Sequence, residues 1–447
     1  MSTNNNQPPN LKPTKREGIA WPEGLFAANQ RQSLRQVLME AAAAGGERRP
    51  GPLADYILQS LVPGGNPKRV AARTQVDAVR KTCGLPEKAC WIMSASRFSE
   101  KVARLRLGPF VHKVNEFLQA NARRMLTSFP PTGRQVNAII DGHEYEYFFE
   151  AHRHRDGRAC RKPNHRHQFM RYAHSSNKRS RYANEWVVTA IQWSSGSERF
   201  TLPIAVQPAY GRFDPAHQLG PLIQWKRRYH IPVRAVLLDR YYDAQAVRDL
   251  ADRNHLRLGW RMVMQRHGKT IVRLKDFKAY VSTQKLTDEA VAKGEFSSWT
   301  DKATGEIHLQ RHVSYLGTLQ GSDRIHRIVA AARVLPDGAG KWKAIPRANI
   351  MLAFPEDFSA DQALRTYRRR WAIEAMFYQW SLDATKPRSQ IIETHVVLYA
   401  ARVMHLACAM AVLQTITVRT GARSLLISIQ EALLLVLEFE EERRPRR

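Results

Sequence analysis

Cysteine is scarce in this 447-residue chain, and its scarcity excludes several architectures. The four cysteines stand at positions 83, 90, 160 and 408, and no two of them form a Cys-x2-Cys pair. Neither a disulfide framework nor a zinc ribbon is therefore predicted. Thiols without partners favour a reducing compartment, so we expect the chain in the cytoplasm.

Long apolar runs without charge are also missing. Residues 1–20 are polar and lack the apolar core of a signal peptide. The most apolar stretch, residues 395–418, contains Arg402 and His405 near its middle. A charge in that position predicts a buried helix rather than a bilayer span, and no membrane partner is expected.

Acidic residues are the third shortage. The chain has 40 Asp and Glu against 70 Lys and Arg, which gives a formal net charge of +30. Because such a field attracts polyanions, the charge favours a nucleic-acid partner. A ribosome-associated or membrane-surface protein is the alternative that composition alone leaves open.

The pattern of the chain predicts several regions. Residues 1–20 are polar and without period, which is typical of a disordered tail. Residues 21–130 contain helical repeats such as "NQRQSLRQVLMEAAAA" and are predicted to form a basic, helical DNA-binding domain. No helix-turn-helix can be assigned within it.

An α/β pattern begins after residue 130. The stretches "QVNAIID", "EWVVTAIQW", "RFTLPIAVQ", "VRAVLLD" and "GWRMVMQRH" are strand-like, and "AQAVRDLADRNH" is helical. Strands alternating with helices predict a mixed sheet with flanking helices. We assign residues 131–270 to the first part of a core, 271–350 to a β-rich insertion, 351–420 to the second part, and 421–447 to a C-terminal helix and charged tail.

Two aspartates end apolar strands in this core. Asp141 closes "NAIID" and Asp239 closes "AVLLD". A turn or cap role is the commonest one for a single aspartate in this position. In open α/β sheets, however, functional groups gather at the carboxyl ends of strands. Together with a third acid, the pair predicts a site for Mg²⁺ or Mn²⁺.

Glu374 is the candidate third acid. It is the single acid of "LRTYRRRWAIEAMFYQWS", and a helix over residues 357–382, capped by Ser359 or Asp361, is predicted to carry it. Tyr367, Arg370, Glu374 and Ser381 share a helix face at this spacing. Glu374 would hold metal while Tyr367 and Arg370 contact phosphate oxygens; the alternative is that it merely neutralises neighbouring arginines.

These motifs together resemble the DDE transposases of prokaryotic insertion sequences, in the branch with a Tyr-x2-Arg-x3-Glu-x6-Lys signature. "YRRRWAIE" (367–374) matches the first three signature residues, and "LLDRYYDAQAVRDLADRN" and "AIID" look like the motifs of the two aspartates. The resemblance covers about residues 135–410. Ser381 stands where the signature has lysine, which puts one phosphate contact in doubt.

The resemblance implies an RNase H-like core, a β-rich insertion before the glutamate helix, and cut-and-paste transposition. Asp141, Asp239 and Glu374 would be catalytic and would bind two Mg²⁺ ions, with Mn²⁺ expected to substitute. The partners would be double-stranded DNA, namely terminal inverted repeats and target, bound by a homodimer near the nucleoid. Expected DNA contacts are Tyr367, Arg370, Trp299, Arg171, Lys178, Arg179 and Arg240.

Some alternatives stay open. Glu144 and Glu146 also lie near the first aspartate position. Residues 151–184 are rich in Arg, Lys and His and predict a phosphate-contacting loop; a solvated loop and a zinc site around Cys160 are the alternatives. Trp299 would stack on a flipped base or pack in a small core. An inactive DNA-binding derivative and an RNase H-like nuclease are the rival functions.

Overall fold

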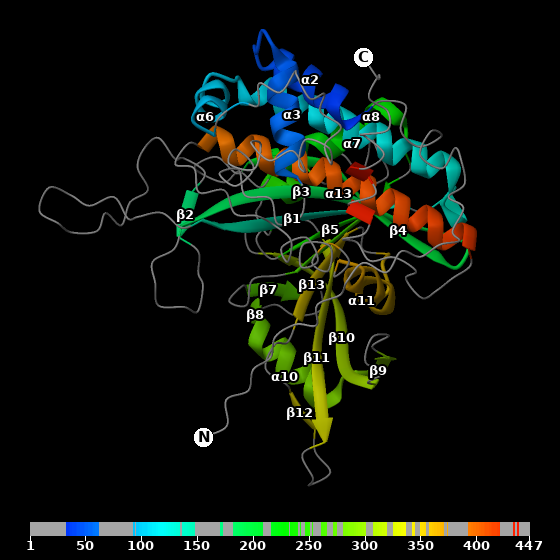
Figure 1. Ribbon diagram of the computed structural model, residues 1–447. Coiled ribbons are helices and arrows are strands. Elements are labelled where there is room, and N and C mark those ends of the chain that lie inside the picture. The colour runs from blue at the N-terminus through cyan, green and yellow to red at the C-terminus, as the bar shows by residue number, and fades with distance from the viewer. Residues whose placement is uncertain are drawn as a thin grey trace, which may run out of the picture.

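The computed structural model places a mixed sheet between groups of helices (Figure 1). It describes residues 33–61, 93, 95–134, 136–147, 170–172, 182–208, 216–231, 233–239, 242, 246–250, 253, 261–265, 271–274, 280–300, 307–319, 325–336, 342–344, 349–354, 357–370, 373, 392–420, 432–433 and 436–437. The predicted α/β class, a mixed sheet with flanking helices, is confirmed.

Five strands form the first part of the sheet. They are β1 (Val136–Tyr147), β3 (Tyr182–Ser195), β4 (Glu198–Pro208), β5 (Val233–Leu238) and β6 (Arg261–Gln265). β3 pairs antiparallel with both β1 and β4, whereas β5 pairs parallel with β1 and β6. The spatial order β4-β3-β1-β5-β6 therefore places β1 and β5 side by side in the middle.

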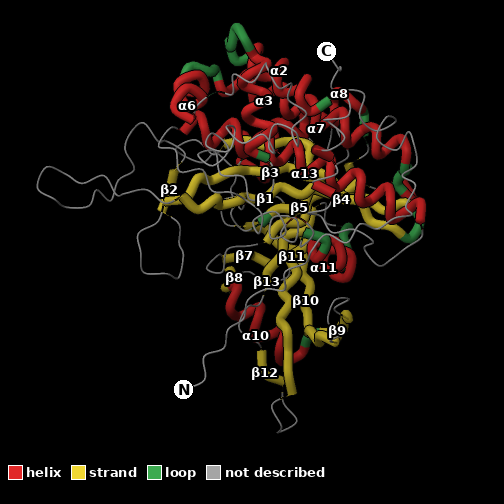
Figure 2. The backbone as a smooth tube through the Cα atoms, viewed as in Figure 1, coloured by secondary structure: helices red, strands yellow, loops and turns green. Residues whose placement is uncertain are grey.

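The same sheet continues into the region that sequence assigns to the insertion (Figure 2). β13 (Asn349–Phe354) pairs antiparallel with β6, β11 (Ile325–Pro336) with β13, and β10 (Ile307–Leu319) with β11. These strands extend away from the helices. Because β13 pairs with β6, this region shares backbone hydrogen bonds with the core. The remaining strands are β2 (Met170–Tyr172), β7 (Ile271–Leu274), β8 (Tyr280–Ser282), β9 (Glu295–Thr300) and β12 (Trp342–Ala344).

Helices cover both faces of the sheet, and two clusters of buried apolar side chains lie between them. One cluster joins Ile139 and Leu237 of the sheet to the N-terminal helices, α11 and α13. The other joins Ile140 and Leu238 to α8 and α10. The helices are α2 (Leu34–Ala44), α3 (Pro50–Ser60), α6 (Ala95–Ala103), α7 (Leu107–Ser128), α8 (Gly220–Tyr229), α10 (Thr283–Lys293), α11 (Ala360–Arg368) and α13 (Ile392–Thr420), with short 3-10 turns at Thr132–Arg134 and His217–Leu219.

Helix α13 is the apolar stretch that sequence predicts to be buried. Residues Glu393–Thr415 are long and apolar enough to cross a membrane, but 89% of the most apolar window is buried inside the protein. The helix packs on α7 and β4, and its His405 Nε2 lies 2.8 Å from the carbonyl oxygen of Leu433. The prediction of a buried core helix is confirmed.

Helix α7 closes the free edge of strand β4. The Asn115 side chain donates to the Val206 carbonyl oxygen at 3.1 Å and accepts from the Val206 amide at 2.9 Å. From α13, Gln414 donates to the Thr201 carbonyl oxygen at 3.1 Å. Side chains thus take the place of a neighbouring strand and satisfy backbone groups that an edge otherwise exposes.

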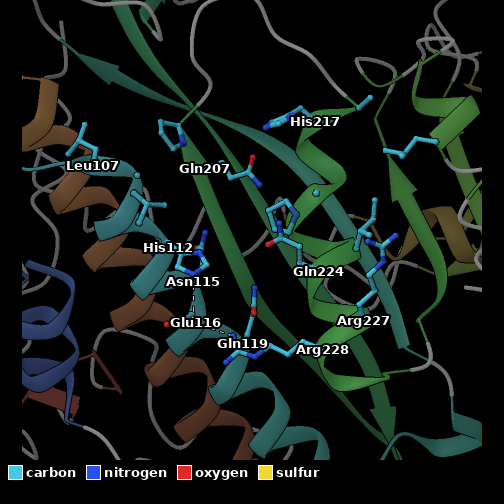
Figure 3. Close-up of a pocket in the computed structure, with 18 residues that line it drawn as sticks. Leu107, His112, Asn115, Glu116, Gln119, Gln207, His217, Gln224, Arg227 and Arg228 are labelled. Carbon is cyan, nitrogen blue, oxygen red and sulfur yellow. Dashed lines mark hydrogen bonds and ion pairs between the residues drawn. The ribbon is translucent and has the colours of Figure 1, made fainter. Parts of the chain in front are cut away.

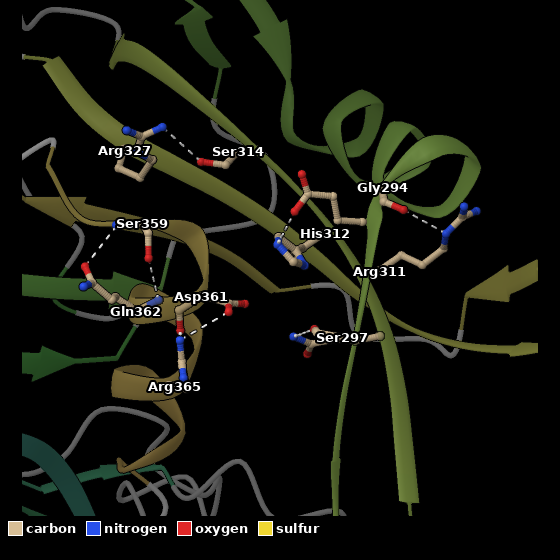
Figure 4. A network of polar contacts seen from close by, with 12 residues as sticks. Gly294, Ser297, Arg311, His312, Ser314, Arg327, Ser359, Asp361, Gln362 and Arg365 are labelled. Atoms are coloured by element: carbon tan, nitrogen blue, oxygen red, sulfur yellow. Dashed lines mark hydrogen bonds and ion pairs between the residues drawn. The ribbon is translucent and has the colours of Figure 1, made fainter.

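Helix α11 begins as the sequence predicts and ends earlier. Ser359 and Gln362 form a capping box, with hydrogen bonds of 3.1 and 3.2 Å (Figure 4). The prediction of an unbroken helix over residues 357–382 is wrong, because α11 ends at Arg368 and a turn follows. Amides of Arg369 and Arg370 bond three residues back instead of four, which tightens the last turn.

Candidate active site at the ends of two parallel strands

Asp141 and Asp239 lie in neighbouring strands at the same level of the sheet. The parallel pairing of β1 with β5 ends at Ile140 and Leu238, so the two aspartates follow directly on both strands. Side chains alternate along a strand, and Ile139 and Leu237 point into the cluster under α13. Both aspartates are therefore expected on that face.

Asp141 differs from the expectation in one respect. The sequence predicts that the strand ends at Asp141, but β1 continues to Tyr147 in antiparallel pairing with β3. Only the pairing with β5 stops there. The carboxylate is thus held inside a rigid strand at the point where the neighbouring strand ends.

Arg370 reaches Asp141 from the turn after α11. Its Nη1 donates to Asp141 Oδ2 at 2.7 Å, and the two side chains are 10% and 11% exposed. Asp141 Oδ1 accepts from the amide of Gly142 at 2.9 Å. Both carboxylate oxygens therefore have a donor, and the negative charge is balanced by a buried guanidinium.

Tyr367 lies beside this ion pair. The Arg370 guanidinium is 5.6 Å from the centre of the Tyr367 ring. Burial raises the pKa of Tyr367, and the negative charges of Asp239 and Asp141 raise it further, while Arg370 lowers it. Because these charges act on one hydroxyl, the four predicted residues Asp141, Asp239, Tyr367 and Arg370 are close together.

A histidine and a tyrosine that the sequence did not indicate extend the site. His143 follows Asp141 by two residues in β1, and its Nδ1 lies 2.8 Å from the Tyr399 hydroxyl of α13. The Tyr399 ring stacks on Trp186 with centroids 4.0 Å apart. Burial lowers the pKa of His143 to about 4, so it is neutral at neutral pH. The signal in the sequence that could have indicated His143 is its position two residues after Asp141 in the same strand.

The structure describes few of the other predicted site residues. Glu374, Arg240, Lys178 and Arg179 lie outside the described residues, as does most of the basic segment 151–184 with its candidate zinc ligands. Arg171 lies in β2, and Trp299 lies in β9 opposite His308. The catalytic role of Glu374 and the DNA contacts of the other five residues stay predictions.

The chemistry of the donors suits a hard cation. Two carboxylates at adjacent strand ends offer oxygen ligands of the kind that Mg²⁺ prefers. In the sequence, Glu374 comes six residues after Arg368, the last residue of α11. Among the described residues, no three His, Cys, Asp or Glu side chains form a metal-binding group.

Comparisons with known proteins add little to this geometry. The sequence matches no protein-family description, and no curated protein is significantly similar to it. The cryo-EM structure of a piggyBac transposase synaptic complex with hairpin DNA is similar over 96% of this chain and 83% of that chain, with 12% identity and a TM-score of 0.45. A likeness this low defines neither family nor function.

Proposed function

We propose that this chain is a DNA transposase of the DDE type, which cleaves DNA at the ends of an insertion sequence and transfers the cut strand to target DNA. The observation that carries the proposal is the placement of Asp141 and Asp239 on adjacent parallel strands with Tyr367 and Arg370 beside them. Asp141 and Arg370 of this group are 229 positions apart in the sequence. The sequence predicts all four as site residues.

The sheet supports an RNase H-like core. An antiparallel meander of β1, β3 and β4 is followed by β5 and β6, both parallel to β1. In such a core, Asp141, Asp239 and Glu374 would hold two Mg²⁺ ions, which would activate a hydroxyl nucleophile and stabilise the leaving oxygen. Tyr367 and Arg370 would contact a phosphate oxygen at this site.

Mg²⁺-dependent nicking tests the proposal directly. The full chain is incubated with duplex DNA containing the sequences that flank its gene, in Mg²⁺ and in EDTA. We expect nicking only with Mg²⁺, and near-complete loss in Asp239→Asn and Glu374→Gln, because each amide keeps the size of the side chain but not its charge. DNA binding in EDTA should persist. Nicking at the wild-type rate by either variant would refute the assignment.

The buried ion pair favours a second candidate, an inactive DNA-binding derivative. A guanidinium on Asp141 Oδ2 occupies an oxygen that a metal ion would need. Such a derivative would bind DNA equally in Mg²⁺ and EDTA and would not nick it. An RNase H-like nuclease would nick DNA but would not join the cut 3′ end to a target duplex, so a strand-transfer assay separates it from a transposase.

A further inference from the structure

A groove lies between α7, α8 and the end of β4, with a volume of about 950 Å³ (Figure 3). Its position follows from the strand register. Asp141 is opposite Val188 of β3, Val188 is opposite Val206 of β4, and Gln207 in the groove follows Val206. Strands β1 and β4 are thus two strand spacings apart, roughly 10 Å, and α8 covers the face of the sheet opposite to that of Asp141.

The polar rim of the groove is basic. Arg227 and Arg228 project from the last turn of α8, and both are exposed. Glu116 is the only acid among the described residues that line the groove. Arg227 is exposed and forms no ion pair with any residue that the structure describes.

Glu116 orients part of this rim. Its carboxylate accepts from Lys113 Nζ at 2.8 Å on the same helix and from Arg228 Nη1 at 3.2 Å across the groove. The Lys113 ammonium is the largest cause that lowers the pKa of Glu116, so the acid stays ionised. Lys113 and Arg228 share the single carboxylate of Glu116, so this cluster keeps a net positive charge. The ion pair with Glu116 on α7 also fixes the position of the Arg228 guanidinium.

Apolar side chains such as Leu107, Val111 and Ile223 line part of the groove. Neutral amides, among them Gln207 and Gln224, line it as well (Figure 3). A nucleic-acid backbone alternates sugars and phosphates, and both match this lining. Deoxyribose rings pack on apolar side chains, and phosphate oxygens accept hydrogen bonds from arginine and amide donors.

We propose that the α7–α8 groove binds the phosphodiester backbone of duplex DNA at the β4 edge of the sheet, with Arg227 and Arg228 as phosphate contacts. The inference rests on the proposed function in that DNA is the bound polymer. It adds a surface that joins the N-terminal helices to the sheet: one wall is α7, and the other is α8.

Binding of a fluorescent 30-base-pair duplex in EDTA, over a range of salt concentrations, tests the groove. Each phosphate contact contributes about 0.9 to the slope of log K against log salt, so Arg227→Ala with Arg228→Ala should flatten the slope by about 1.8. We expect about tenfold weaker binding at 0.1 M salt. Arg227→Lys with Arg228→Lys should retain the slope.

The matched control removes the same charge elsewhere. Lys285 and Lys293 are exposed on α10, and changing both to alanine should leave the slope within error of wild type. A flattening as large as that of the groove variant would show a general charge effect and overturn the proposal. So would an unchanged slope in the groove variant.

A second measurement does not depend on charge. A photo-crosslinking side chain at Gln224, in the groove, should capture the DNA, whereas one at the exposed Gln284 of α10 should not. Equal capture at the two positions, or none at Gln224, would refute the groove. Because nicking by Asp239→Asn is scored separately, the groove and the proposed chemistry can fail independently.

Discussion

Arg370 is the residue that balances the charge of the Asp141 carboxylate inside the protein. A carboxylate this deeply buried loses its hydration, and the guanidinium at 2.7 Å replaces it. The pair also ties the turn after α11 to strand β1, beside Tyr367. Loss of Arg370 should therefore affect stability as well as any contact with DNA.

Arg370→Met is expected to lower the free energy of unfolding by about 3–5 kcal/mol, because it leaves a buried carboxylate without its partner. The double variant Asp141→Asn with Arg370→Met should recover most of this loss. Urea unfolding followed by circular dichroism measures both.

The control lies on the same helix. Arg365 forms an exposed ion pair with Asp361 at 3.2 Å, and Arg365→Met should cost about 0.5 kcal/mol or less. If the two single variants were equally destabilised, Arg370 would have no special role in the buried pair.

At the scale of elements, helix α7 has two tasks. Its first half packs with α2 and α13, and its later turns pack against the opposite face of the sheet through residues such as Met125. Between them, Asn115 occupies the hydrogen-bonding edge of β4. The helix therefore serves both as a layer of the core and as a cover for the sheet edge.

Asn115→Ala should lower the free energy of unfolding by about 1–3 kcal/mol, since it leaves the amide and carbonyl of Val206 without their protein partner. It should also promote association through the opened edge. Chemical denaturation and light scattering measure the two effects.

Thr127→Ala on the same helix provides a comparison. Thr127 is exposed and donates only to the Arg123 carbonyl oxygen one turn back, so its loss should change neither quantity appreciably. Aggregation as strong in this variant as in Asn115→Ala would contradict the edge-cover role.

Elements with strong local signals were predictable, whereas their ends and joins were not. The alternation and apolar runs of β1, β3, β4 and β5 identify them as strands, and Ser359 marks the start of α11. The end of α11 depends on Arg370 turning towards Asp141, a contact that no local pattern encodes. The same holds for His143 with Tyr399, and for the continuation of the sheet from β6 through β13 into β11.

At the scale of the whole molecule, the histidines His143 and His405 make stability depend on acid. Burial lowers the pKa of His143 and of His405 to about 4, while unfolding restores values near 6.5. The unfolded chain therefore binds more protons between these values. Stability from this source is complete above about pH 6.5 and is lost as the pH falls towards 4.

His143→Gln keeps a polar group opposite Tyr399 but does not titrate, so its stability should fall less steeply than that of wild type between pH 6.5 and 4.5. Melting temperatures across this range measure the slope. His230→Asn, at an exposed position with φ of 50°, should retain the wild-type slope. Identical slopes in all three proteins would exclude His143 as a cause.

The separation of Arg370 from Asp141 along the chain also has a consequence for biosynthesis. The two are 229 residues apart, and at about 5–20 residues per second a ribosome needs roughly 10–45 s to travel from one to the other. Helix α13, which covers the same face of the sheet, follows later still. Throughout that interval the Asp141 carboxylate has no guanidinium partner, and the part of the sheet face that α11 and α13 later cover is exposed as β1 and then β5 emerge, so we expect the nascent chain to bind chaperones at this stage.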